Sequence, residues 1–121
     1  MNIAADFIPT GILFIVIIGF GIWNSQIGKP YNGLLFNIHK LIALGAVILT
    51  GLRLWQTIPF IEFPGLVIIL LVVSVICVLT LFATGAIMSI KEKETRIVLG
   101  FHQVSPVLIA ISMGWILFLL K

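Results

Sequence analysis

Residues 65–90 read GLVIILLVVSVICVLTLFATGAIMSI, and no side chain in this run carries a charge. An α-helix rises about 1.5 Å per residue, so about 20 apolar residues cross the hydrocarbon core of a membrane. The run is longer than that and has no polar face. We therefore predict a transmembrane helix over residues 65–90, and this helix places the chain among integral membrane proteins.

Three further stretches are long and apolar enough to span a membrane: residues 7–27, 34–57 and 97–120. The first holds no charged residue, and the last holds His102 as its one titratable group. The stretch 34–57 differs because it contains His39, Lys40 and Arg53. Lys40 and Arg53 lie near its ends, where long basic side chains can reach the lipid headgroups.

The composition excludes several classes of protein. Of 121 residues, 61% are hydrophobic and only 9% are charged, whereas a soluble domain carries about 25% charged residues. A soluble globule and a nucleic-acid binder are therefore excluded, and we expect the lipid bilayer as the partner of most of the surface. The single cysteine, Cys77, excludes an internal disulfide, an iron–sulfur cluster and covalent attachment of haem.

Short connections join the predicted spans, at Asn24 to Gly33, Trp55 to Gly65 and Lys91 to Arg96. Short connections make each helix antiparallel to the one before it. We therefore predict an all-α fold, an integral membrane four-helix up-and-down bundle that forms a single transmembrane domain over residues 1–121.

The basic residues predict the orientation in the membrane. Five of the seven belong to one side, together with the first and third loops, and two belong to the other side: Lys29, Lys40, Lys91, Lys93 and Arg96 against Arg53 and Lys121. Lys and Arg are enriched on the cytoplasmic side of membrane proteins. We therefore expect a multi-pass protein of the cell membrane, with loops one and three in the cytoplasm and both termini outside.

The two histidines of the chain, His39 and His102, both fall inside predicted spans. An ionisable residue inside a membrane is costly and is by default a candidate for function. Each lies about six residues from the cytoplasmic end of its span, which is about 9 Å of depth. Because the second and fourth spans are diagonal in a simple bundle, the two imidazoles can meet from opposite sides at one depth. This arrangement predicts two axial ligands of one haem iron.

Small side chains at this depth leave room for a flat ligand. We expect the haem to lie against six of them: Gly19, Gly21, Ala43, Ala46, Gly85 and Ala86. Lys40 follows His39 directly and is a candidate partner of a haem propionate, although it can equally extend to the headgroups.

Two other interpretations of the histidines stay open. Each imidazole can hydrogen-bond a neighbouring helix and stabilise the fold without a cofactor. The pair can also serve another metal or proton transfer. A zinc site is the weakest of these alternatives, because no Asp, Glu or Cys lies at the same depth.

The segments FNIHKLIALGAVILTGLRLW around His39 and LGFHQVSPVLIAISMGW around His102 resemble the transmembrane b-type cytochromes. This group includes the haem-binding membrane cores of quinol, ascorbate and ferric reductases. The resemblance implies non-covalent haem b, axial ligation by His39 and His102, and transfer of single electrons. Many members hold two haems with four histidines, and this chain has two histidines, so we expect one haem.

A haem with two histidine ligands has no open position for a substrate, so one-electron transfer is its natural role. The expected exchange is with a quinone or with a redox partner protein, and a homo-oligomer is also open. The chain is then an electron-transfer protein or the membrane subunit of an oxidoreductase. The alternatives are a membrane anchor or structural subunit without haem, and a small transporter. Ion-coupled transport normally needs an intramembrane acid, and residues 7–27 contain none.

Overall fold

The structure is a computed structural model that describes residues 2–60, 62, 64–91 and 95–120. Its elements are α1 (Ile3–Asp6), α2 (Ile8–Ile27), α3 (Gly33–Thr57), the short 3-10 helix η1 (Ile58–Phe60), α4 (Gly65–Ile90) and α5 (Arg96–Leu119). The described residues contain no strand. The prediction of an all-α protein is confirmed.

Four of these helices, α2 to α5, are long and apolar enough to cross a membrane. Each begins and ends within one residue of the span predicted from the sequence. They fit a multi-pass membrane protein. The orientation stays a prediction, and two of the basic residues on which it depends, Lys93 and Lys121, lie outside the described residues.

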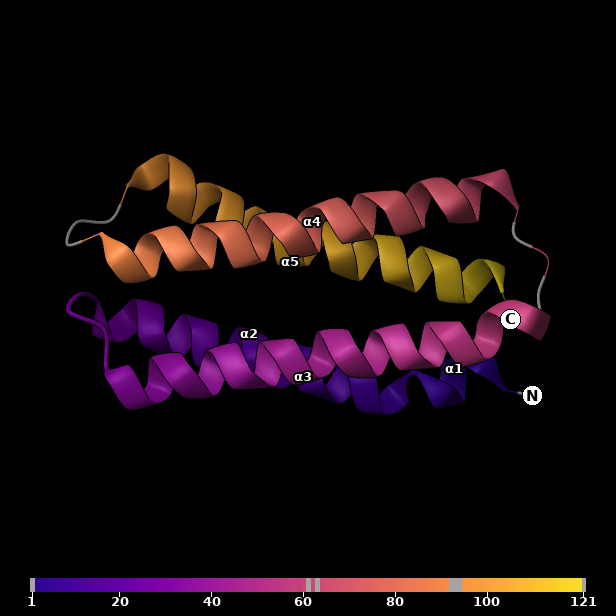
Figure 1. Cartoon of the computed structure of the whole chain (residues 1–121), viewed down its shortest axis with the longest axis horizontal. Helices are drawn as coiled ribbons and strands as arrows, with labels where there is room; N and C mark the ends of the chain where they lie inside the picture. Colours follow the sequence, from indigo (N-terminus) through magenta and orange to yellow (C-terminus); the bar gives the residue numbers. More distant parts are fainter. Residues whose placement is uncertain (1, 61, 63, 92–94, 121) are drawn as a thin grey trace. The chain divides into compact units, whose positions relative to one another are not determined.

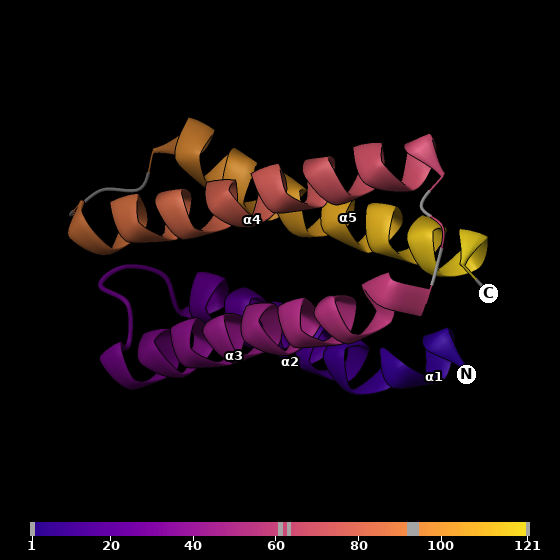
Figure 2. The same cartoon turned by 45° about the vertical axis from the view of Figure 1, so that its right-hand side comes forward.

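The chain divides into two compact units, Met1–Glu62 and Phe63–Lys121. In the first unit α2 packs against α3, and in the second α4 packs against α5. Figures 1 and 2 show each pair side by side and antiparallel, so each unit is a helical hairpin. We call them the first and the second hairpin. The diagonal placement of the second and fourth spans stays a prediction.

The loop of the first hairpin is defined by two local signals. Gly28 ends α2 with a positive φ of 75°, a conformation that glycine adopts without a steric penalty. Asn32 then caps α3, because its side-chain oxygen accepts from the amides of Leu34 and Leu35 at 3.0 and 3.2 Å. These caps satisfy backbone groups that the helix itself leaves unpaired.

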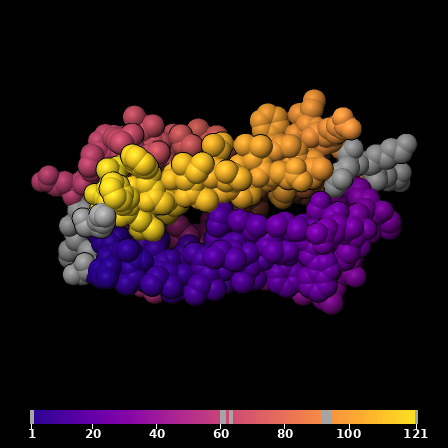
Figure 3. Space-filling model, turned by 180° about the vertical axis from the view of Figure 1, so that it is seen from behind, coloured from indigo at the N-terminus to yellow at the C-terminus, as the bar shows by residue number. Residues whose placement is uncertain are grey.

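Burial in both hairpins is the reverse of that in a soluble protein. Large apolar side chains are exposed along every long helix. In Figure 3 the atoms of α5, in orange to yellow, form one continuous band on the face of the second hairpin that is in view. Small polar side chains are buried instead, including Ser74, Thr84, Ser105 and Ser112. Lipid solvates apolar side chains as well as a protein core does, so membrane helices pack through small residues.

Four of the buried hydroxyl groups are satisfied within their own helices, whereas Oγ1 of Thr10 on α2 has no hydrogen-bond partner among the described residues. Each of the four donates to the carbonyl four residues earlier: Thr57 to Arg53, Ser74 to Leu70, Thr84 to Thr80, and Ser105 to Phe101. Such a bond consumes the single hydroxyl hydrogen and leaves the oxygen able to accept another hydrogen bond.

Candidate functional site

His39 is the seventh residue of α3, and its imidazole reaches across to α2. Its Nδ1 lies 3.1 Å from the carbonyl oxygen of Ile17. A carbonyl can only accept, so Nδ1 carries the proton and donates. In the neutral imidazole the other nitrogen, Nε2, then holds the lone pair that can bind a metal.

Gly21 makes this contact possible. A Cβ added at Gly21 would lie 3.2 Å from Cε1 of His39, which is closer than ordinary van der Waals contact. In an α-helix the carbonyl of Ile17 pairs with the amide of Gly21, four residues later. The missing side chain at Gly21 therefore lets the imidazole approach that carbonyl.

His102 is the seventh residue of α5 and makes the equivalent contact in the second hairpin. Its Nδ1 lies 2.9 Å from Oγ1 of Thr84 on α4. The one hydrogen of the Thr84 hydroxyl is directed to backbone carbonyls of its own helix, at 2.7 Å from Thr80 and 3.2 Å from Leu81. The Thr84 oxygen therefore accepts from Nδ1 of His102, and Nε2 again holds the lone pair.

The two hairpins thus present their histidines in the same way. Each histidine comes one helical turn or more after the loop, donates from Nδ1 to the preceding helix, and lies beside a glycine of that helix. The glycine of the second hairpin is Gly85, where an added Cβ would lie 3.5 Å from Cε1 of His102, an ordinary contact. A metal-binding histidine almost always donates from its other nitrogen in this manner, because the bond fixes both the tautomer and the ring orientation.

Each hairpin offers one imidazole nitrogen that can bind a metal. Among the described residues no three His, Cys, Asp or Glu side chains gather closely enough to hold a metal ion. A structural zinc site takes four protein ligands and a catalytic one takes three. Haem iron takes four nitrogens from the porphyrin and needs at most two axial ligands from the protein.

The structure places the other predicted site residues unequally. Gly21 and Gly85 lie against the histidines, and Ala46 is buried on α3. Gly19 is exposed and would meet nothing within 4 Å if it carried a Cβ. Ala43 is half-buried, and Ala86 is exposed on α4.

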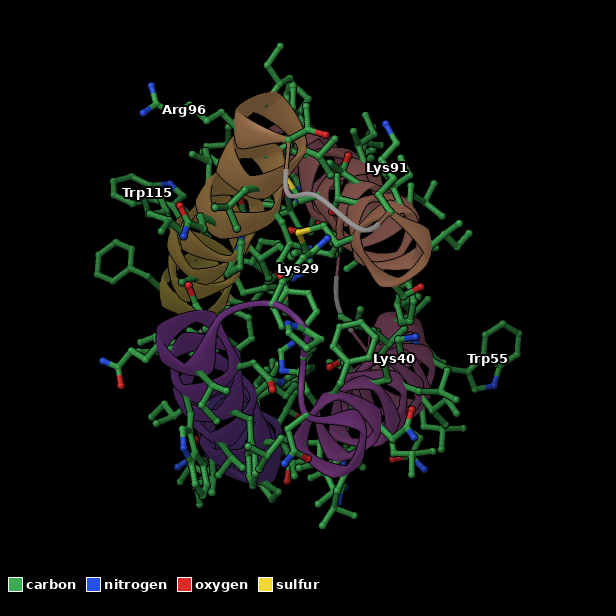
Figure 4. The ribbon with its side chains drawn as sticks, turned by 90° about the vertical axis from the view of Figure 1, so that its left-hand side faces the viewer. Lys29, Lys40, Trp55, Lys91, Arg96 and Trp115 are labelled. Atoms are coloured by element: carbon green, nitrogen blue, oxygen red, sulfur yellow. The ribbon has the colours of Figure 1, made fainter. Side chains whose placement is uncertain are left out.

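Four basic residues, Lys29, Lys40, Lys91 and Arg96, lie toward the loop ends of their own hairpins (Figure 4), whereas Arg53 lies near the other end of α3. In the first hairpin Lys40 is exposed, and its Nζ lies 4.3 Å from the centre of the Phe36 ring. Phe36 is one turn closer to the loop, so Lys40 bends toward that end. Lys29 lies in the loop, with Nζ 5.4 Å from the centre of the Tyr31 ring. Lys91 and Arg96 flank the loop of the second hairpin.

Sequence reasoning missed two of the groups that hold the histidines. Thr84 stands between the small residues Ala83 and Gly85, and a hydroxyl at the depth of His102 was a usable signal. Nothing comparable in the sequence indicates the carbonyl of Ile17, because every residue has a backbone carbonyl. Only its place four residues before Gly21 distinguishes it.

No protein family, curated protein or solved structure matches this chain.

Proposed function

We propose that the protein is a membrane b-type cytochrome that holds one non-covalent haem b through Nε2 of His39 and of His102. The observation that supports this proposal most is that the two imidazoles have the same tautomer. Both donate from Nδ1 to the helix that precedes them, at 3.1 and 2.9 Å, so both carry their lone pair on Nε2. Nε2 is the nitrogen that such a hydrogen bond prepares for a metal.

The chemistry that the haem would supply is the uptake and release of one electron. The residues of the chain would act by orienting the two imidazoles. Ile17 and Gly21 fix the ring of His39, and Thr84 fixes the ring of His102. Two histidine ligands would leave no open position at the iron for a substrate, so electron transfer with a quinone or a redox partner protein is the function that we favour.

The test is the pigment. The chain purified from haem-replete cells should show a sharp Soret band and, after reduction, the narrow α band of six-coordinate haem. His39→Ala and His102→Ala should each lose this spectrum, and added imidazole should restore it by filling the empty axial position. A colourless wild-type chain that stays colourless after addition of haem would overturn the proposal, and so would retention of the spectrum by both variants.

The hydrogen bonds of the histidines also favour a second candidate, a structural subunit without haem. Interhelical hydrogen bonds inside a membrane stabilise helix pairs by about 0.6 kcal/mol on average. In this case His39→Ala would loosen the first hairpin, and imidazole would not rescue it. The wild-type absorption spectrum distinguishes the two candidates directly.

We also propose that the protein lies in the cell membrane, with the loops of both hairpins on the cytoplasmic side. The native cysteine, Cys77, is buried, so single cysteines can be placed in a Cys77→Ser background. Gln26→Cys, at the end of α2, should react with an impermeant thiol reagent from the cytoplasmic side, and Glu62→Cys should react from outside. The opposite pattern of labelling would reverse the orientation.

A further inference from the structure

The first hairpin contains a buried amide that the fold leaves without a partner. The side chain of Asn24 on α2 is only 5% exposed. Neither its Oδ1 nor its Nδ2 has a hydrogen-bond partner among the described residues. A buried polar group without a partner loses its hydration with no compensation, so such a group in a folded chain requires an explanation.

Asn24 lies on the same face of α2 as the groups that hold His39. It follows Ile17 by seven positions and Gly21 by three, which are the spacings of one helix face. Three residues correspond to about 4.5 Å along α2, in the direction of the loop. The amide therefore lies about one turn closer to the loop than the contact between Gly21 and His39.

The charges at this end of the first hairpin favour an anion. Lys29 lies in the loop, and Lys40 bends toward the loop over Phe36. No side chain in α2, in α3 or in the loop between them is acidic. A carboxylate entering this region would meet positive charge and the amide hydrogens of Asn24.

The second hairpin serves as an internal comparison. Met88 follows Gly85 by three positions, as Asn24 follows Gly21, and it is also buried. A thioether is a weak acceptor and needs no hydrogen-bond partner when buried. At this position the need for a hydrogen-bond partner therefore exists in the first hairpin and not in the second.

We infer that the Asn24 amide donates a hydrogen bond to a propionate carboxylate of the haem that His39 ligates. The inference rests on the proposed function. Haem b carries its two propionates on one edge, and a hydrogen bond to an ionised carboxylate is about twice as strong as one between neutral groups. Nδ2 of Asn24 can only donate, which suits an acceptor of this kind.

The test compares haem b with its dimethyl ester, in which both propionate carboxylates are capped. The chain is reconstituted with each porphyrin, and transfer to an excess of a soluble haem-scavenging protein is followed at the Soret band. Asn24→Leu keeps the size of the side chain and removes the donor. Met88→Leu is the matched control at the corresponding position of the second hairpin.

Asn24→Leu should release haem b about tenfold faster than the wild type, which is the lower end for a hydrogen bond to a charged group. It should accelerate release of the dimethyl ester clearly less, because the ester carbonyl is a neutral and weaker acceptor than the carboxylate. Met88→Leu should leave both rates within about twofold of the wild type. Equal acceleration for both porphyrins would make Asn24 a packing residue and overturn the inference, as would no change for either. A wild-type chain that binds neither porphyrin would overturn the proposed function itself, and that result is seen before any variant is made.

Discussion

Both hairpins hold their histidine through a hydrogen bond from Nδ1, but the acceptor of that bond differs between them. The first ties His39 to a backbone carbonyl, that of Ile17, and the second ties His102 to a side-chain hydroxyl, that of Thr84. A carbonyl of a helix lies close to the helix axis, so the imidazole must approach closely, and a Cβ at Gly21 would press on the ring. A hydroxyl extends from the helix and meets the imidazole further out.

The glycines reflect this difference. An added Cβ would lie 3.2 Å from the His39 ring at Gly21 and 3.5 Å from the His102 ring at Gly85. The first hairpin therefore depends on the absence of a side chain, and the second depends on the presence of one. The two histidines should respond to different substitutions.

The largest difference between the hairpins is expected from alanine at the two glycines. Gly21→Ala forces the His39 ring away from Ile17, and overpacking of this kind costs about 1–3 kcal/mol. We expect at least about a fivefold loss of haem affinity, read from titrations at the Soret band. Gly85→Ala fits and gains helix propensity of up to about 1 kcal/mol, so its affinity should stay within about twofold of the wild type. A greater loss from Gly85→Ala than from Gly21→Ala would contradict the difference drawn between the hairpins.

A smaller effect is expected at Thr84. Thr84→Val keeps the shape but removes the acceptor for Nδ1 of His102, which makes the imidazole a weaker electron donor. The oxidised iron is then less well stabilised, so the midpoint potential should rise by tens of millivolts, the size that about 1 kcal/mol implies for one electron. Thr84→Ser should restore the wild-type potential in a redox titration. Equal potentials in Thr84→Val and the wild type would show that the hydroxyl does not act on the iron through His102.

The smallest effect is expected at Lys40. Its ammonium group lies over the Phe36 ring at an exposed site, and an exposed charge contributes at most about 1 kcal/mol to pairing with a carboxylate. Lys40→Met should therefore leave the haem release rate within about fivefold of the wild type. If Lys40→Met accelerated haem release as much as Asn24→Leu, Lys40 would be a principal partner of the propionates, as the sequence first allowed.

The sequence was sufficient for the helices and insufficient for the contacts between them. Uncharged runs such as residues 65–90 define membrane spans because the requirement is length and apolarity alone. The matching positions of His39 and His102 could also be read directly, and each is the seventh residue of its helix.

The partners of the histidines could not be predicted from the sequence in the same way. Gly19 and Gly21 are equivalent by composition and depth, but only Gly21 lies on the face of α2 that His39 contacts. The choice depends on the rotation of α2 about its axis. In a helix that is apolar all round, no amphipathic pattern defines that rotation. Asn24 could have indicated this rotation, because a polar amide in an apolar span is expected to face away from lipid. In the structure Asn24 is buried.

The central claim is that each hairpin contributes one axial imidazole to a single iron. Near-infrared magnetic circular dichroism of the oxidised protein tests it most directly, because the position of its charge-transfer band identifies the pair of axial ligands. The account predicts the band of two imidazoles, with one haem per chain. The band of any other ligand pair, or a high-spin spectrum with an open axial position, would contradict it.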